Sequence, residues 1–174
     1  MTVRPIRYLG DPVLRKPAKK VSRVDDSIRR LIADMTESMY AAHGVGIAAP
    51  QIGVGLRVVV IGMPDEEPFA LINPEVIKRS GERRLDEGCL SVPGYRGSVT
   101  RSLSVVVKAL DEHGREIRVK AEGDMLAQCL EHETDHVNGL LYVDRLDAKT
   151  DLVKVGVPRT VPDDGAEDEM DEEA

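Results

Sequence analysis

Apolar residues recur at helical spacing in two long segments of the chain. The first segment covers residues 27–42, and its apolar stripe consists of Ile28, Leu31, Ile32, Met35 and Met39. An aspartate or serine at positions 25–27 can cap its start, and Gly44 marks its end. The second segment covers residues 124–137 and stops at Asn138-Gly139. The spacing therefore predicts two long helices, and the first is clearly amphipathic.

Shorter apolar stretches predict strands. Residues 56–62 are typical of a buried strand, and residues 69–73 form a shorter one that Pro74 closes. Further strands are expected at residues 75–79, 102–110 and 115–121, with a hairpin turn at residues 111–114 between the last two. Segregated strands with two long helices indicate an α+β fold, in which mixed or antiparallel sheets pack around the second helix.

The length and charge pattern indicate one domain with an extension. The 174 residues contain 41% hydrophobic and 32% charged residues, which is typical of a folded globular chain. We assign residues 1–147 to a single domain and residues 148–174 to a C-terminal extension. Residues 163–174 contain eight acidic residues and no basic one, so we expect disorder from about residue 163. The net charge of −7 therefore describes the tail rather than the body.

Composition also disfavours several partners. Aromatic residues make up only 3% of the chain and Trp is absent, so a base-stacking platform for nucleic acid is not expected. The acidic balance disfavours binding to phosphate backbones. Pro5 and two arginines interrupt the N-terminal ten residues, and no stretch reaches transmembrane length. We therefore predict a cytoplasmic protein with no membrane association. In that reducing compartment the thiols of Cys89 and Cys129 more often serve metal binding or catalysis than a disulfide.

The second predicted helix carries the pattern His-Glu-x-x-His. His132 and His136 lie four residues apart, so their imidazoles are neighbours on one helix face and can converge on one ion. Glu133 stands beside them, where it can accept a proton from water at the ion. The pattern predicts a metal site with His132 and His136 as ligands and Glu133 as the acid/base residue.

A catalytic site needs a third protein ligand and one open position. Cys129 lies about 10 Å along the helix from His136, too far to share its ion, and is better interpreted as a small apolar residue. His113 falls on a predicted hairpin turn and is interpreted as a solvated turn residue. His43 lies at a helix end, where it can interact favourably with the helix dipole, so it is interpreted as structural. Cys89 remains by elimination. A structural metal site or a binding module stays an alternative, although no fourth protein ligand is well placed.

Three segments resemble, in order and spacing, the motifs of the peptide deformylase family. They are Gly44-Val45-Gly46-Ile47-Ala48-Ala49-Pro50-Gln51, Glu87-Gly88-Cys89-Leu90-Ser91 and Gln128-Cys129-Leu130-Glu131-His132-Glu133-Thr134-Asp135-His136. The resemblance runs from about Ile6 to Leu146. It implies a metal-dependent hydrolase that removes the formyl group from the N-terminal formyl-methionine of newly synthesised polypeptides and releases formate. A zinc-type metallopeptidase is the alternative, since the helical motif is shared with that class.

The resemblance also implies a role for individual residues. The metal ligands are Cys89, His132 and His136, and the acid/base residue is Glu133. Gln51 and the backbone N–H of Leu90 hold the developing oxyanion. The residues expected to contact the peptide are Val45, Gly46, Gly88 and Arg96, and those expected to line the methionine pocket are Val45, Met125 and Cys129.

The resemblance implies one divalent ion and one class of substrate. The family favours Fe²⁺ in the cell, and Zn²⁺, Ni²⁺ or Co²⁺ can substitute at a site of one thiolate and two imidazoles. The implied partners are N-formyl-methionyl nascent peptides, with transient proximity to the ribosome. Many family members end in a basic helix associated with docking near the ribosomal exit tunnel. This chain ends instead in acidic residues, which repel RNA phosphates, so that docking mode is not expected.

Overall fold

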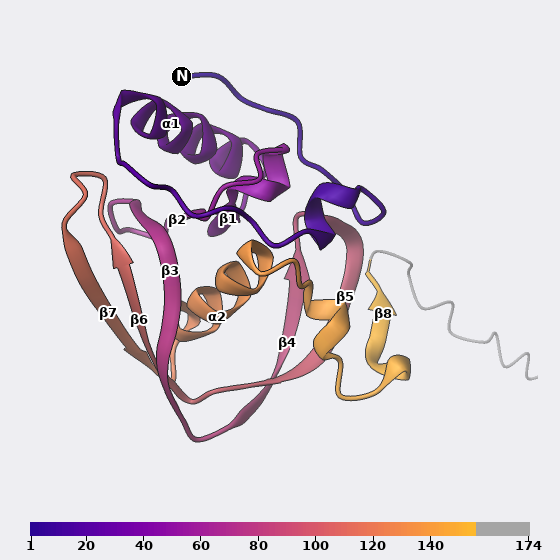
Figure 1. Ribbon diagram of the computed structural model, residues 1–174. Coiled ribbons are helices and arrows are strands. Elements are labelled where there is room, and N and C mark those ends of the chain that lie inside the picture. The colour runs from indigo at the N-terminus through magenta and orange to yellow at the C-terminus, as the bar shows by residue number, and fades with distance from the viewer. Residues whose placement is uncertain (156–174) are drawn as a thin grey trace, which may run out of the picture.

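The computed structural model describes residues 1–155 as an α+β fold with two antiparallel sheets and two long helices, which confirms the predicted fold class (Figure 1). The five-stranded sheet runs in the order β1 (Gly46–Ala48), β2 (Val58–Ile61), β3 (Phe69–Ser80), β6 (Ser104–Leu110) and β7 (Glu116–Glu122). The three-stranded sheet consists of β4 (Arg83–Cys89), β5 (Val92–Arg101) and β8 (Leu152–Lys154). The predicted disorder from residue 163 lies outside the described residues.

Helix α2 (Met125–Val137) lies between the two sheets (Figure 1). Asp124 caps its start, because its carboxylate accepts the N–H of Ala127 at 2.8 Å. Gly139 ends the turn that follows, with φ at 78°, and a Cβ there would lie 2.7 Å from the carbonyl oxygen of Arg15. Because sheets cover it on two sides, α2 is buried almost all round from Ala127 onwards. Its polar residues therefore point into the protein interior.

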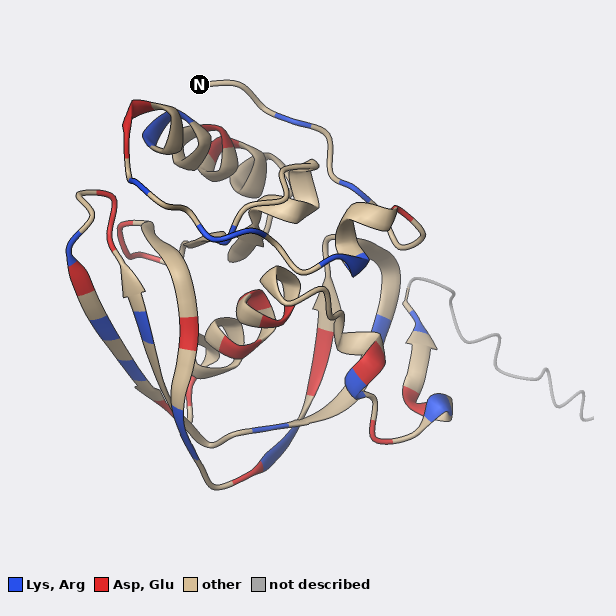
Figure 2. Ribbon diagram, viewed as in Figure 1, with Lys and Arg blue, Asp and Glu red and all other residues tan. Residues whose placement is uncertain are grey.

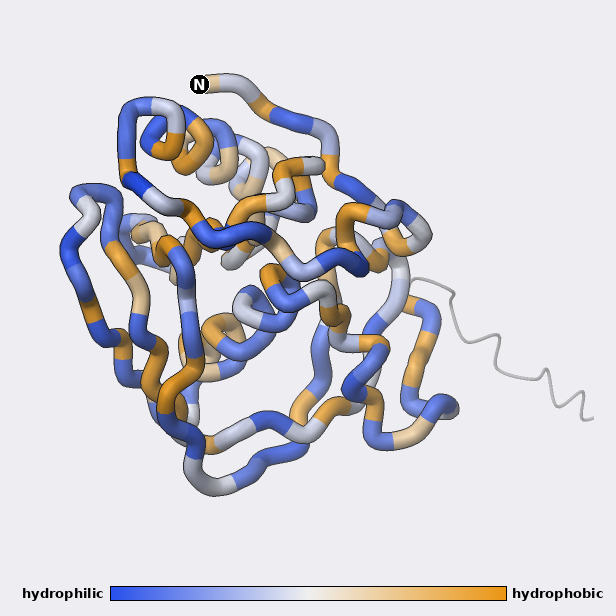
Figure 3. Tube along the Cα trace, viewed as in Figure 1, coloured by the Kyte–Doolittle hydropathy of each residue, from blue (hydrophilic) through white to orange (hydrophobic). Residues whose placement is uncertain are grey.

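Helix α1 (Asp26–Ala41) covers the other face of the five-stranded sheet. Asp25 accepts the N–H groups of Ser27 and Ile28, as the sequence predicted for a cap at 25–27. The predicted apolar stripe is buried, and hydrophobic and hydrophilic segments alternate along the helix (Figure 3). This stripe packs against Val58 and Val60 of β2.

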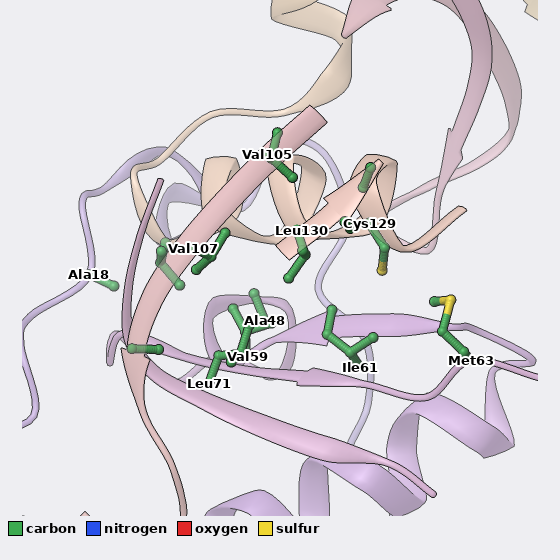
Figure 4. Packing of buried hydrophobic residues seen from close by; sticks show 14 residues of the cluster. Ala18, Ala48, Val59, Ile61, Met63, Leu71, Val105, Val107, Cys129 and Leu130 are labelled. Carbon is green, nitrogen blue, oxygen red and sulfur yellow. The ribbon is translucent and has the colours of Figure 1, made fainter. Parts of the chain in front are cut away.

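Strand β2 has a continuous apolar sequence because both of its faces are buried. Val58 and Val60 face α1, whereas Val59 and Ile61 belong to the cluster that faces α2. Figure 4 shows Ile61 and Leu130 of α2 on opposite sides of this second apolar layer. The central sheet thus fixes both helices.

Several elements differ from the predicted ones. The two strands predicted at 69–73 and 75–79 are one strand, β3, whose register shifts between Ile72 and Glu75. Strands β4 and β5 were not predicted, since their sequences mix charged and apolar residues without a long apolar run (Figure 2). Part of the chain beyond residue 147 also packs against the domain, since β8 pairs with β5 in the register Arg96↔Val153. Within residues 1–155, no helix combines the length and apolar character needed to cross a membrane.

Candidate active site

Three side chains that could bind a metal ion meet between α2 and β4. His132 and His136 come from α2, and Cys89 is the last residue of β4. One ligand atom from each of the three lies within 4.8 Å of the others, and the Cys89 Sγ atom is 3.3 Å from Nε2 of His136. Donors that bind one zinc-like ion at about 2.0–2.3 Å need such proximity. The three residues predicted as ligands are therefore brought together from two distant segments.

Glu87 fixes the orientation of the His132 ring. Its Oε2 atom lies 2.8 Å from Nδ1 of His132, and its carboxylate also accepts two hydrogen bonds from Arg101 at 2.7 and 2.9 Å. Burial alone would raise the pKa of Glu87, but the bonds from His132 and Arg101 outweigh it and lower the pKa to about 2. A carboxylate only accepts, so Nδ1 carries a proton, and Nε2 is the ring nitrogen that is left to bind an ion.

Arg101 connects this pair to the protein surface. It is buried, and its Nη1 atom donates to Asp135 at 2.7 Å. Arg145, which is partly exposed, donates to both oxygens of the same carboxylate. Burial lowers the pKa of Arg101, but Glu87 and Asp135 outweigh it and raise the pKa above its ordinary value. A buried chain of ion pairs thus supports the orientation of His132.

Glu133 has an unpartnered carboxylate oxygen at the candidate metal site. The side chain is 4% exposed, and its Oε2 atom has no hydrogen-bond partner in the described part of the chain. Burial raises the pKa of Glu133 to about 7. A buried carboxylate without a partner is costly unless a ligand or cation completes it. The residues present therefore fit a divalent ion with a proton-exchanging ligand beside Glu133.

All but one of the predicted site residues line a single cavity of about 400 Å³. With His132 and Glu133, they are Val45, Gly46, Gln51, Gly88, Cys89, Leu90, Arg96, Met125 and Cys129. The exception, His136, is 1% exposed, and its Nε2 atom contacts the Cys89 sulfur. The cavity lining also includes His43, which the sequence assigned a structural role only. His43 has φ at 57°, so the chain turns sharply there after α1 and enters the cavity wall.

The side chains that line this cavity differ in their exposure to solvent. Arg96, one of the lining residues, is half-exposed and pairs with Asp86, with Nε 2.6 Å from Oδ2. Met125, the first residue of α2, is 52% exposed. Cys129 is buried deeper, and burial followed by the charges of Glu133 and Glu87 raises the pKa of its thiol well above the ordinary value. Cys129 is therefore a neutral thiol, as expected of a small apolar lining residue.

The sequence did not identify Glu87, Arg101 or Asp135 as part of the site. Both Glu87 and Asp135 do stand inside the quoted motifs, Glu87 two residues before Cys89 and Asp135 immediately before His136. Their inward orientation depends on the alternation of β4 and on burial of α2 from both sides, which a helical or strand pattern alone does not reveal. Arg101 carries no motif signal, since a lone arginine at a strand end is usually solvated.

Comparisons with known proteins agree with this geometry. The family model described as polypeptide deformylase matches residues 3–151. The peptide deformylase of Dehalococcoides mccartyi (strain BAV1) is 50% identical over 165 residues, covering 94% of this chain and 98% of that protein. The crystal structure of a peptide deformylase from Legionella pneumophila is 48% identical with a TM-score of 0.81, covering 85% of this chain and 88% of that one. That of the Synechococcus elongatus enzyme in complex with actinonin is 44% identical with a TM-score of 0.81, covering 85% and 81%.

Proposed function

The chain belongs to the polypeptide deformylase family, and we propose that its site removes the formyl group from the formyl-methionine of newly made polypeptides. The observation that carries this proposal is the meeting of one thiol and two imidazoles beside a buried, unpartnered Glu133 oxygen. The thiol and the two imidazoles supply three metal ligands and leave a coordination position open for water or substrate. Glu133 is a proton acceptor beside that position. The cavity of about 400 Å³ gives a peptide end access to the same place.

The ligands in this proposal are Cys89, His132 and His136. When bound, a divalent ion lowers the pKa of water and polarises a carbonyl group. One thiolate with two imidazoles suits several ions, and we infer that Fe²⁺ is used in the cell, with Zn²⁺, Ni²⁺ or Co²⁺ able to replace it. Glu87 supports this role by holding the proton on Nδ1 of His132.

Glu133 moves the proton in the reaction. Its carboxylate takes a proton from the water that attacks the formyl carbon. As the carbon–nitrogen bond breaks, Glu133 gives that proton to the departing amine, so the products are formate and a peptide with a free N-terminus. A pKa raised by burial to about 7 suits a group that must be deprotonated and then protonated near neutral pH.

Gln51 and Leu90 stabilise the charge that develops on the formyl oxygen. The Nε2 atom of Gln51 lies 3.6 Å from the Cys89 sulfur, at the edge of the ligand set. Leu90 directly follows Cys89, so its backbone N–H belongs to the same short connection between β4 and β5. The loss of one such donor typically costs about 3 kcal/mol of transition-state stabilisation.

The remaining predicted residues bind the peptide. Val45, Gly46 and Gly88 offer backbone groups along the cavity, and a peptide can hydrogen-bond to them as an added strand. Val45, Met125 and Cys129 form an apolar pocket for the flexible methionine side chain. Arg96 also lines the cavity and is half-exposed, so we assign it to contacts with the peptide residues that follow the methionine.

We further propose a cytoplasmic enzyme whose partners are nascent formyl-methionyl peptides near the ribosome. Residues 1–147 form the catalytic unit in this proposal, and residues 148–155 pack against it through β8. The eight acidic residues at 163–174 argue against docking on ribosomal RNA through a basic C-terminal segment.

One assay tests the activity against the metallopeptidase alternative. Metal-loaded protein is offered formyl-Met-Ala-Ser and acetyl-Met-Ala-Ser, and formate, new amine and peptide-bond cleavage are measured. Formate from the first peptide alone is the expected result. Cleaved peptide bonds would favour the peptidase, and no reaction with either peptide would contradict both activities.

Glu133→Ala should abolish turnover and keep the ion, whereas loss of the ion would show that Glu133 has another role. Elemental analysis of anaerobically purified protein tests the choice of Fe²⁺.

A further inference from the structure

The side-chain amide of Gln51 is held at both of its ends. Its Oε1 atom accepts the backbone N–H of Ala48 at 2.9 Å. A backbone N–H only donates, so this bond fixes which end of the amide is oxygen. The Nε2 end therefore points toward the ligand set, where it donates to the Ser91 hydroxyl at 3.1 Å and lies 3.6 Å from the Cys89 sulfur.

Ser91 is itself fixed from two directions. Its backbone N–H points at the Cys89 sulfur at 3.4 Å, and its carbonyl accepts the N–H of Leu9 at 2.8 Å. The residue is fully buried. These contacts use the backbone alone, so removing the hydroxyl leaves both in place. The hydroxyl is therefore a separable part of Ser91 whose partner is the Gln51 amide.

We propose that Ser91 is a positioning residue for the deformylation reaction. An amide nitrogen carries two N–H groups, and the Ser91 oxygen accepts one of them. The amide plane is then set by Ala48 on one side and Ser91 on the other. The second N–H donates to the Cys89 sulfur at 3.6 Å and so faces the ligand set, where the formyl oxygen would develop charge. This inference rests on the proposed function and deepens it, because it explains what aims Gln51.

The expected consequence is a loss of rate with little loss of binding. Without the Ser91 oxygen, the first N–H has no partner, and the amide can rotate to share its donors with other acceptors. A misaimed donor weakens the transition state more than the ground state. We expect Ser91→Ala to lower kcat about 10-fold with KM within about twofold, a smaller effect than the 10²–10³-fold expected for Gln51→Ala.

A double-mutant cycle in the full-length, zinc-loaded protein tests this inference. In the Gln51→Ala background, Ser91→Ala should lower kcat by less than about twofold, because the group that Ser91 aims is gone. Equal effects of Ser91→Ala in both backgrounds would overturn the proposal, as would a loss of zinc from the single variant. Formate release by the unaltered protein tests the proposed function, and only the ratios among variants test Ser91, so the two can fail separately.

Ser102 supplies the matched control. It is also buried, and its hydroxyl bonds Glu131 at 3.0 Å on a part of α2 that does not line the cavity. Ser102→Ala should keep kcat within about twofold of the unaltered protein. Hydrogen exchange at Nε2 of Gln51, followed by NMR of ¹⁵N-labelled zinc protein, gives a readout that needs no turnover. Ser91→Ala should accelerate that exchange at least about 10-fold and Ser102→Ala should not, while unchanged exchange in Ser91→Ala would overturn the proposal.

Discussion

Gly46 in β1 and Glu133 in α2 lie so close that a Cβ atom at position 46 would be 2.6 Å from Oε1 of Glu133. The same Cβ would be 2.6 Å from the thiol sulfur of Cys129. The carboxylate of Glu133, which we propose as the acid/base group, thus occupies the space that a side chain at position 46 would need. The requirement for glycine here is steric, since Gly46 has no positive φ.

Gly46→Ala should therefore inactivate the enzyme without loss of the bound metal ion. The added methyl displaces the Glu133 carboxylate, and loss of a positioned acid/base group lowers kcat by about 10²–10⁴-fold. Its position does not involve the ligand atoms, so the metal content should stay at that of the unaltered protein. Formate release and elemental analysis measure the two quantities.

Gly55→Ala is the control for that substitution. A Cβ on Gly55 meets nothing within 4 Å, and its φ is not positive, so activity should be unchanged. If Gly46→Ala retained more than half of the original kcat, the tight contact with Glu133 would have no catalytic consequence.

Glu87→Gln should weaken metal binding and folding together. The substitution keeps the shape of the side chain but removes the charge that faces Arg101 and the Nδ1 proton of His132. Loss of such a supporting group typically lowers metal affinity about 10–100-fold. It also leaves the buried positive charge of Arg101 with one partner charge fewer. We therefore expect the free energy of unfolding of the metal-free protein to fall by about 3 kcal/mol. Competition with a chelator and urea denaturation provide the measurements.

Glu116→Gln removes the same charge from an exposed pair. Its partner Lys108 lies 3.2 Å away, and both side chains are about half-exposed. The free energy of unfolding should change by less than about 1 kcal/mol, and metal affinity should not change. A similar loss in both variants would mean that the burial of the Glu87 pair contributes nothing.

Local patterns carried much of the fold and part of the site. The stripe of α1 and its cap at Asp25 depend on residues a few positions apart, so the sequence predicted them within a residue or two. The spacing of His132 and His136 likewise defines one helix face wherever the helix lies. The family and its activity followed from three short motifs, and the comparisons confirmed them.

The rest depended on contacts between distant segments. Strand β4 places charged residues next to one another, with Asp86 beside Glu87, and only its packing against α2 decides that Glu87 points inward. Its partner Arg101 lies 14 residues further along, and Asp135 lies 34 beyond that. No helical or strand periodicity links such positions, so the chain of ion pairs behind His132 was invisible in the sequence.

Asn73 tests a second contact that the sequence did not reveal. Its side chain exchanges two hydrogen bonds of 2.8 Å with the backbone of Val21, and its own φ is 53°. Asn73→Ala loses both bonds and keeps an unfavourable φ, so the free energy of unfolding should fall by about 3 kcal/mol. Asn73→Gly loses only the bonds and should be about 1 kcal/mol more stable than the alanine variant. Urea denaturation of both gives the comparison, and equal stabilities would show that the positive φ carries no strain.

The two cysteines of the chain offer a final matched test of the ligand set. Both line the cavity, but only the Cys89 sulfur approaches a histidine nitrogen, at 3.3 Å from Nε2 of His136. The Cys129 sulfur lies 3.8 Å from the carbonyl oxygen of Val45. Cys89→Ala should therefore lose the ion and all formate release, since two imidazoles alone bind a divalent ion much more weakly. Zinc stoichiometry after gel filtration, measured on unfolded protein with a colorimetric chelator, gives the first result directly.

Cys129→Ala should keep one equivalent of zinc and a kcat within about threefold of the original. Removing its sulfur widens the pocket proposed for methionine, so KM for formyl-Met-Ala-Ser should rise severalfold while KM for the formyl-ethionine analogue, whose side chain is one methylene longer, rises less. The contrast separates ligand from lining residue, because a destabilised fold would lower zinc content in both variants alike. If Cys129→Ala lost the ion while Cys89→Ala kept it, the assignment of the third ligand would be wrong.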